Sequence, residues 1–211
     1  NRQSDTEEIQ ARVRLTPLTT FVVRAQAIQD RFDNALTRNA DSVSIVPGFE
    51  LRPEALISGE VFAGVRRFTT LSDAEPDYTG IVAHVRARYV LASTRVAINV
   101  SRDVAYSYET TLPYYTLTDA GLEITQLITG SWDLVARGSR QSLAYRTVTP
   151  DLTPERTDTG WMAGAGIGYR IGETLRIGVD VNDYTRTVNG NEARSYRGLR
   201  AGASISYGLP R

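Results

Sequence analysis

The sequence lacks several residue types, and each absence excludes a class of structure or function. None of the 211 residues is cysteine, so structural disulfides and thiolate metal sites are excluded. Histidine occurs only once and no acidic cluster has the spacing of a calcium loop, so we expect neither a metal site nor a cofactor. Basic and acidic residues balance at 24 each, which argues against a nucleic-acid-binding protein, because such proteins are strongly basic.

Long hydrophobic runs are also missing. No stretch approaches the roughly 18 consecutive apolar residues that indicate a transmembrane helix. Strands can also cross a membrane, and each needs only about 9–11 residues, of which every second one is apolar. The mean hydropathy of −0.26 therefore does not count against a membrane β-barrel, because half of each strand is polar.

The clearest pattern lies in residues 81–108. Odd positions are apolar in 81–89, and the even positions of 96–108 are mostly apolar. A period of two indicates extended strands with one apolar and one polar face. A two-residue turn at Ala92 and Ser93 sets a register in which apolar residues face apolar residues, and polar residues face polar residues, across the two arms. The arms have the length of membrane-spanning strands, so we expect a transmembrane β-hairpin.

The same alternation recurs along the whole chain and predicts eleven strands. Short turns alternate with longer polar loops, which is typical of outer-membrane barrels. We therefore predict one domain over residues 1–211, an all-β, antiparallel, up-and-down transmembrane β-barrel of which about 11–12 strands are present. The predicted short turns lie near residues 17, 53, 92, 130 and 173.

Four places fit the pattern less well. Residues 1–8 are polar, and we expect them to be frayed or part of a loop. Pro47 lacks an N–H group, which predicts an edge strand or a bulge. The alternation is ragged over residues 138–145. Arg102 interrupts an apolar parity, so we expect it near a membrane interface or a subunit contact, where its cost is smaller than the roughly 2–4 kcal/mol of mid-bilayer.

The strand count also predicts that the barrel is incomplete. The first predicted strand runs toward a short turn, so its N-terminus lies on the long-loop side. The last strand ends on the short-turn side, which is the periplasmic side of such barrels. Bacterial barrels normally have an even number of strands and periplasmic termini. We therefore expect at least one N-terminal strand to be missing, so that residues 1–211 form the C-terminal part of a larger barrel. An alternative is that residues 1–8 are the remnant of that strand.

Aromatic residues on the apolar parity gather beside the short turns and the last strand's end. Aromatic residues at one height are typical of the girdle where a barrel meets the membrane interface. The alternative is that they belong to the core of a large β-sandwich, although sandwich strands are shorter. The residues of the predicted girdle are Phe49, Tyr89, Trp132, Tyr169 and Tyr207.

If the apolar parity faces lipid, the other parity lines the lumen. Arginines outnumber acids there, which favours the passage of anions. The alternative is that these arginines pair across strands with acidic residues and fill a polar interior; those acids are Glu50, Glu60, Glu123, Asp133 and Asp180. The predicted pore-lining residues are His84, Arg86, Arg88, Arg95, Arg137, Arg170, Arg176, Glu50 and Asp180.

No arrangement of residues predicts an enzyme. His84 and Ser101 are expected to be cross-strand neighbours, with Asp103 further along the same arm, but no oxyanion hole or nucleophile elbow accompanies them. Gly160, Gly164, Gly166 and Gly168 share one parity and do not form a GxGxxG motif before a helix, so they predict close backbone approach or room at the lumen wall.

Several segments resemble the β-barrel porin type 2 family of bacterial outer-membrane proteins. They are PEAL at 53–56 followed by GEVFAG at 59–64, and YVLASTR at 89–95 followed by VSRD at 100–103. The resemblance implies a bacterial outer-membrane location, outer-membrane lipid around the barrel and, for some such barrels, exopolysaccharide export. The chain departs from the family in two ways. It is shorter than a complete member, and it does not end on the aromatic residue that is usual for such barrels, because four residues follow Tyr207.

Two functions follow as predictions. The first is a porin-like channel or polysaccharide-export barrel, which passes small anionic solutes or exopolysaccharide. The alternative is a non-conducting structural barrel subunit that associates with other envelope proteins. Neither prediction involves catalysis or nucleic acid.

Overall fold

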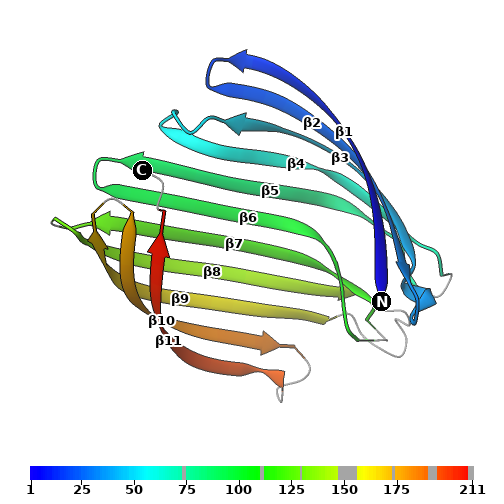
Figure 1. The fold of residues 1–211 in the computed structure, drawn as a ribbon. Helices are drawn as coiled ribbons and strands as arrows, with labels where there is room; N and C mark the ends of the chain where they lie inside the picture. The colour runs from blue at the N-terminus through cyan, green and yellow to red at the C-terminus, as the bar shows by residue number, and fades with distance from the viewer. Residues whose placement is uncertain are drawn as a thin grey trace.

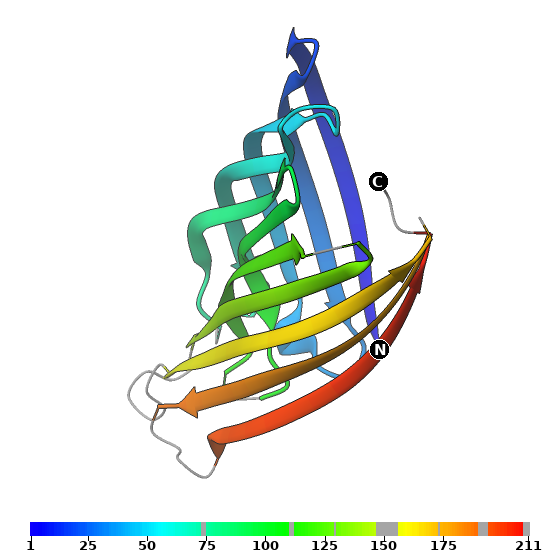
Figure 2. The ribbon, with the colours of Figure 1, turned by 90° about the vertical axis from the view of Figure 1, so that its left-hand side faces the viewer.

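The strands form a single layer. The computed structural model describes residues 1–72, 75–109, 112–128, 130–146, 156–172, 174–189 and 194–208. Figures 1 and 2 show these strands curled into an open trough. The eleven strands follow one another in chain order within one antiparallel sheet, which confirms the predicted all-β, up-and-down architecture. They are β1 (Arg2–Thr16), β2 (Thr19–Phe32), β3 (Ala40–Leu51), β4 (Ile57–Thr70), β5 (Tyr78–Leu91), β6 (Thr94–Tyr106), β7 (Tyr114–Leu127), β8 (Trp132–Arg146), β9 (Arg156–Ile171), β10 (Leu175–Val188) and β11 (Tyr196–Tyr207).

Short turns and longer connections lie at opposite ends of the strands, which we call the short-turn end and the long-loop end. The short turns join β1 to β2, β3 to β4, β5 to β6, β7 to β8 and β9 to β10, as predicted. Residue 173 of one predicted turn lies outside the described residues. At the long-loop end, the β2–β3 connection contains a short 3-10 helix, η1 (Leu36–Arg38).

The β5–β6 hairpin has the predicted register. Tyr89 lies opposite Val96 and Val85 lies opposite Val100, so apolar residues face each other across the pair. The turn consists of the two residues between Leu91 and Thr94. Its first residue, Ala92, has a φ of 50°, in the left-handed region that favours glycine.

Three local predictions are corrected or completed. Residues 2–8 are not frayed: they belong to β1, where the ladder with β2 extends as far as Arg2 opposite Phe32. Pro47 lies in an internal strand, and the β3–β4 register is the same on both sides of it, so it marks neither an edge nor a bulge. The ragged segment 138–145 is part of the continuous strand β8.

Contacts between strands two places apart identify the concave face. Arg66 on β4 reaches Asp103 on β6 at 3.0 Å, and Arg24 on β2 reaches Glu60 on β4 at 3.7 Å. A side chain can span an intervening strand only where side chains converge, which happens on the inner side of a curved sheet. The polar parity therefore faces the concave side.

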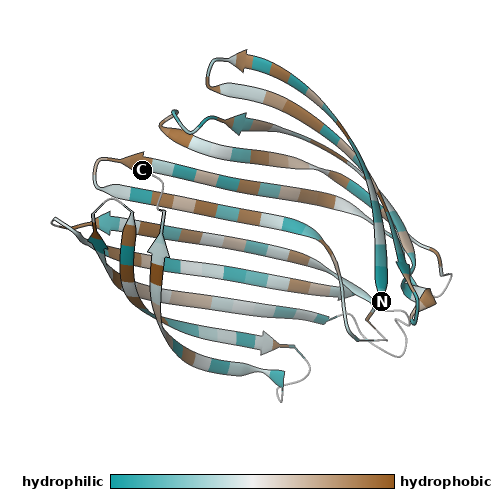
Figure 3. Ribbon diagram, viewed as in Figure 1, coloured by the Kyte–Doolittle hydropathy of each residue, from teal (hydrophilic) through white to brown (hydrophobic). Residues whose placement is uncertain are grey.

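The convex face carries the apolar parity and is uncovered. Ile45 is 58% exposed and Val65 is 53% exposed, and both lie on this face. Figure 3 shows the alternation of hydrophobic and hydrophilic residues along the strands. The largest apolar surface of this molecule thus points outward.

The buried apolar centre lies at the long-loop end. The β5–β6 ladder stops at Ala83 opposite Arg102, whereas the β6–β7 ladder continues to Tyr106 opposite Tyr114. Figure 1 shows β6 bending near this end. Beyond the bend, the end of the β6–β7 hairpin turns toward the concave side. There it packs into a cluster formed by Ala40, Phe68, Tyr78 and Tyr114, with Val104 and Tyr106 against it.

The two edges of the sheet run in the same direction. Successive strands are antiparallel throughout, so the odd-numbered strands β1 and β11 are parallel to each other. No pairing joins them, and the described sheet is therefore open. Because a closed antiparallel barrel has an even number of strands, closure of this sheet needs an odd number of further strands between the edges.

The left-handed residue in the β5–β6 turn gives a stability prediction. We expect Ala92→Gly to stabilise the protein by about 0.5–1 kcal/mol, because glycine adopts a positive φ without steric cost. Urea-induced unfolding in detergent micelles measures the change. Ala97→Gly, within β6, is the matched control and should destabilise the protein by about 0.5–1 kcal/mol. Equal losses in both variants would contradict the assignment.

Candidate functional site

The concave face brings the predicted pore-lining residues onto one surface. All nine lie on the polar parity of β3, β5, β6, β8, β9 and β10. They fall into two groups: seven take part in ion pairs between arginine or histidine and an acidic side chain, and two arginines do not.

Glycines in β9 allow side chains of β10 to reach β8. A Cβ atom on Gly168 would lie 2.2 Å from the guanidinium group of Arg176, so only glycine leaves space for that side chain. Arg176 crosses β9 at this position and its Nη2 binds Asp133 Oδ1 at 2.6 Å. Arg170 also contacts Asp133, at 3.3 Å, and the Asp133 side chain is fully buried. Of the two alternatives predicted for these glycines, Gly168 thus fits room at the concave wall, which the Arg176 side chain occupies.

Further ion pairs cover the middle of the concave face. Arg137 lies 3.7 Å from Glu123 and 3.9 Å from Asp180. These pairs join β8 to β7 and to β10, so the charges compensate each other across the strands.

A second network centres on Glu60 of β4. It lies 3.0 Å from Nε2 of His84, 3.7 Å from Arg24 and 3.9 Å from Arg86. Arg24 also binds Glu50 at 3.1 Å. The alternative prediction, that arginines pair across strands, is thus confirmed for most of the concave face.

Arg88 and Arg95 differ from these residues. Neither has an acidic partner within ion-pair distance among the residues that the structure describes. They lie on neighbouring strands close to the short-turn end, three residues before Leu91 and one residue after Thr94. This part of the concave face carries uncompensated positive charge.

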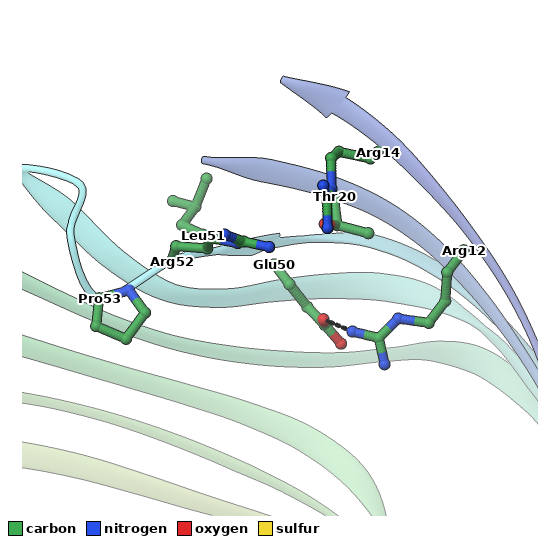
Figure 4. A pocket seen from close by; sticks show the side chains of 7 residues that line it. All are labelled: Arg12, Arg14, Thr20, Glu50, Leu51, Arg52 and Pro53. Carbon is green, nitrogen blue, oxygen red and sulfur yellow. Dashed lines mark hydrogen bonds and ion pairs between the residues drawn. The ribbon is translucent and has the colours of Figure 1, made fainter. Parts of the chain in front are cut away.

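A hollow of about 510 Å³ adds to the positive charge at the short-turn end. Figure 4 shows that Arg12 points toward Glu50, with which it forms an ion pair. Arg14 and Arg52 also line the hollow, which leaves three arginines around one glutamate. The short-turn end therefore contains more arginines than acids at two places.

The long-loop end is crossed by the β6–β7 hairpin. The Tyr106 hydroxyl donates a hydrogen bond to Asp30 on β2 at 2.9 Å, and Arg2 of β1 lies 4.8 Å from the Tyr106 ring. Tyr106 thus faces inward, which corrects its assignment to the lipid-facing parity. The bend after Arg102 is the reason, because it turns this face of the hairpin toward the concave wall.

Glu109, which follows β6, ties the same hairpin to distant segments. Its carboxylate binds Arg156 at 2.8 Å and Arg194 at 2.7 Å, and its backbone carbonyl accepts a hydrogen bond from Arg38 at 3.1 Å. The hydrogen bonds from Arg156 and Arg194 hold the pKa of Glu109 below its usual value. The hairpin end is therefore anchored at several points around the trough.

The sequence analysis missed this crossing, although one signal was present. Tyr106, Tyr114 and Tyr115 flank the connection between the two strands, whereas Tyr108 within it is exposed. Leu112 and Pro113 beside them are buried. An aromatic, apolar connection between two strands could have indicated that it packs inside.

The residues considered for catalysis do not assemble. His84 lies opposite Ser101, as expected, but its Nε2 contacts Glu60, and Asp103 is paired with Arg66. In the described segments, no group of three histidine or acidic side chains could hold a metal ion. None of the described residues form a helix with the length and hydropathy of a membrane span.

Comparisons with known proteins do not assign a family. No protein-family model matches the chain, and no curated protein matches it. The resemblance to the β-barrel porin type 2 family stays a prediction from the residues.

The Glu109 contacts give a pH prediction. Because its pKa is lowered, its contribution to stability is present above the usual glutamate pKa and is lost as the pH falls through the lowered value. We expect Glu109→Gln to cost about 1 kcal/mol at neutral pH and less at acidic pH, where the Glu109 carboxylate becomes protonated. Urea unfolding in detergent at both pH values measures the difference.

Glu75 is the control for that experiment. It is buried, and burial raises its pKa, so its ionisation opposes folding as the pH rises. Glu75→Gln should therefore stabilise the protein at neutral pH relative to acidic pH, with the opposite sign to Glu109→Gln. The same sign in both variants would contradict the proposed role of Glu109.

Proposed function

We propose that this chain forms the β-sheet wall of a bacterial outer-membrane barrel, whose concave face lines a polar passage for small anionic solutes or polysaccharide. The observation that carries the proposal is the division of one long-stranded sheet into an exposed apolar convex face and a charged concave face. Each strand has 12–16 residues, which exceeds the roughly 9–11 that a tilted strand needs to cross a bilayer.

Two features of the convex face support a membrane location. In water, apolar patches larger than a few hundred Å² mark interaction surfaces, and this face extends over the whole sheet. The aromatic residues lie where an interfacial girdle would lie: Trp132 and Tyr169 pack edge to face at the short-turn end, with ring centroids 4.9 Å apart. Phe21 and Phe49 form a similar pair, 5.4 Å apart, on β2 and β3.

The concave face supports a polar passage. A barrel of about twelve strands is wider than an eight-stranded one, whose interior is filled by side chains. The uncompensated charges of Arg88 and Arg95 lie at the short-turn end of this passage, where they would attract anions. The resemblance to outer-membrane barrels adds weight to the same proposal.

A second candidate is a non-conducting structural barrel subunit of an envelope assembly. The inward-turned end of the β6–β7 hairpin favours it, because Tyr106 and Glu109 tie this segment across the trough. Ion pairs also compensate most of the concave charges. On this reading, the barrel is closed at its long-loop end.

Conductance measurements in planar bilayers test the channel. We expect single-channel steps with an anion preference, and we expect the double variant Arg88→Gln, Arg95→Gln to shift the reversal potential toward zero in a salt gradient. The physical reason is that these two arginines carry charge that no acid compensates.

The matched control for that experiment is Arg67→Gln, which removes an arginine from the convex face. It should leave the reversal potential unchanged. An unchanged potential in the double variant would contradict the selectivity role of Arg88 and Arg95, and the absence of single-channel steps would overturn the channel proposal.

The hairpin contacts distinguish the two candidate functions. We expect the double variant Tyr106→Phe, Glu109→Gln to increase the single-channel conductance about two-fold or more if the hairpin end restricts an open passage, because it loses charge-assisted hydrogen bonds worth about 1–3 kcal/mol each. A folded variant that still produces no steps would favour the structural subunit.

A further inference from the structure

Three arginines interrupt the apolar parity of the convex face at one level. They are Arg67 on β4, Arg102 on β6 and Arg140 on β8, and we call them the arginine collar. Arg67 lies ten residues beyond the first residue of β4, and the other two each lie eight residues beyond the first residue of their strands. All three strands begin at the short-turn end, so the collar lies past the midpoints of these strands, on their long-loop side.

The register places each collar residue among convex neighbours. Arg67 lies opposite Val43, which is 56% exposed. Arg140 lies between Ala120 on β7 and Trp161 on β9. Both arginines are exposed, whereas Arg102 is half-buried at the bend of β6.

Within the strands β4 to β9, no acidic residue lies on the face of the collar, and Asp41 on β3, which lies diagonally from Arg67, is paired with Arg31. Every aspartate and glutamate within β4–β9 belongs to the concave parity; these residues are Glu60, Asp103, Asp119, Glu123, Asp133 and Asp158. The convex arginines of the outer strands differ, because Arg31 pairs with Asp41 at 2.7 Å and Arg197 pairs with Asp183 at 2.6 Å. Among the described strands, the convex arginines of the collar thus lack the cross-strand acid that Arg31 and Arg197 have.

Neighbouring side chains hold two of the guanidinium groups in place. Arg102 Nη1 donates a hydrogen bond to the Thr118 hydroxyl at 2.7 Å. The Arg140 guanidinium lies over the Trp161 ring, 5.0 Å from its centroid. A guanidinium has five N–H donors, so both side chains keep donors free for a ligand.

The level of the collar suits a membrane interface. An arginine facing lipid costs about 2–4 kcal/mol at the bilayer midplane but only about 0–1 kcal/mol near an interface. Eight to ten residues of tilted strand span about 20–25 Å from the short-turn end, close to the height of the apolar band of such barrels. The short-turn edge of this band carries aromatic residues and the other edge carries arginines.

We infer that the arginine collar binds the phosphate groups of anionic lipids in the leaflet at the long-loop end. This inference rests on the proposed membrane location. Arginine binds phosphate through paired, charge-assisted hydrogen bonds, and the strands that carry the collar have no convex carboxylate to compete with it. The collar thus selects lipid on one side of the membrane, because the short-turn edge of β4–β9 has no convex arginine.

The two tryptophans provide a test, because one lies at each edge. Trp161 lies at the collar and Trp132 lies at the short-turn end. The variant Trp132→Phe leaves only Trp161 as a fluorophore. The vesicles contain phosphatidylcholine and a minor fraction of brominated phosphatidic acid, which quenches tryptophan fluorescence. We expect the quenching of Trp161 to correspond to an enrichment of phosphatidic acid of about five-fold or more over the bulk lipid. The reason is that one arginine near a charged surface contributes about that factor.

Substitutions assign the effect to the collar. In the Trp132→Phe background, the triple variant Arg67→Gln, Arg102→Gln, Arg140→Gln should abolish the enrichment, whereas Arg88→Gln on the concave face should preserve it. The variant Trp161→Phe, which leaves Trp132, should show no enrichment at the short-turn edge. High salt should reduce the Trp161 enrichment, because it screens exposed charges.

The outcomes separate this inference from the proposed function. Brominated phosphatidylcholine should quench both tryptophans if the barrel is inserted. No quenching by either lipid overturns the membrane location, and the collar with it. Quenching by both lipids in proportion to their bulk amounts overturns the lipid inference and leaves the membrane location intact. An enrichment of phosphatidic acid that survives in the triple arginine variant has the same consequence.

Discussion

The continuous backbone ladder from β1 to β11 is the constraint on which the rest of the structure depends. It holds long strands in a single layer, and each inner strand pairs with a neighbour on both sides along most of its length. With one layer and no second sheet, each side chain lies on either the convex or the concave face. In the described sheet, β1 and β11 each keep one whole edge unpaired, and in a membrane such edges have to be closed, because no water is available to pair them.

Curvature gives the two faces different physical roles. Side chains converge on the concave face, so residues from strands two places apart form ion pairs, as Arg176 does with Asp133 across Gly168. On the convex face the side chains diverge, and apolar residues such as Ile45 stay exposed. One alternating pattern therefore produces a charged interior and an apolar exterior without a conventional hydrophobic core.

The two ends of the strands differ as well. The short-turn end has aromatic residues outside and unpaired arginines inside, whereas the long-loop end has arginines outside and a buried aromatic cluster inside. The inward-turned β6–β7 hairpin builds that cluster. An asymmetric wall of this kind suits a membrane with two different surfaces, which connects the proposed passage with the proposed lipid contacts.

The sequence alone determined the strand number, the two faces and the β5–β6 register, because these depend on a local period of two and on turn chemistry around Ala92. It also indicated that the glycines of β9 allow close approach. Only the tertiary structure decided which acid each arginine meets, since a partner such as Asp133 lies two strands away from Arg176. It alone placed Tyr106 inside: a bend after Arg102 reverses what parity predicts, and contacts with strands distant in sequence stabilise that bend.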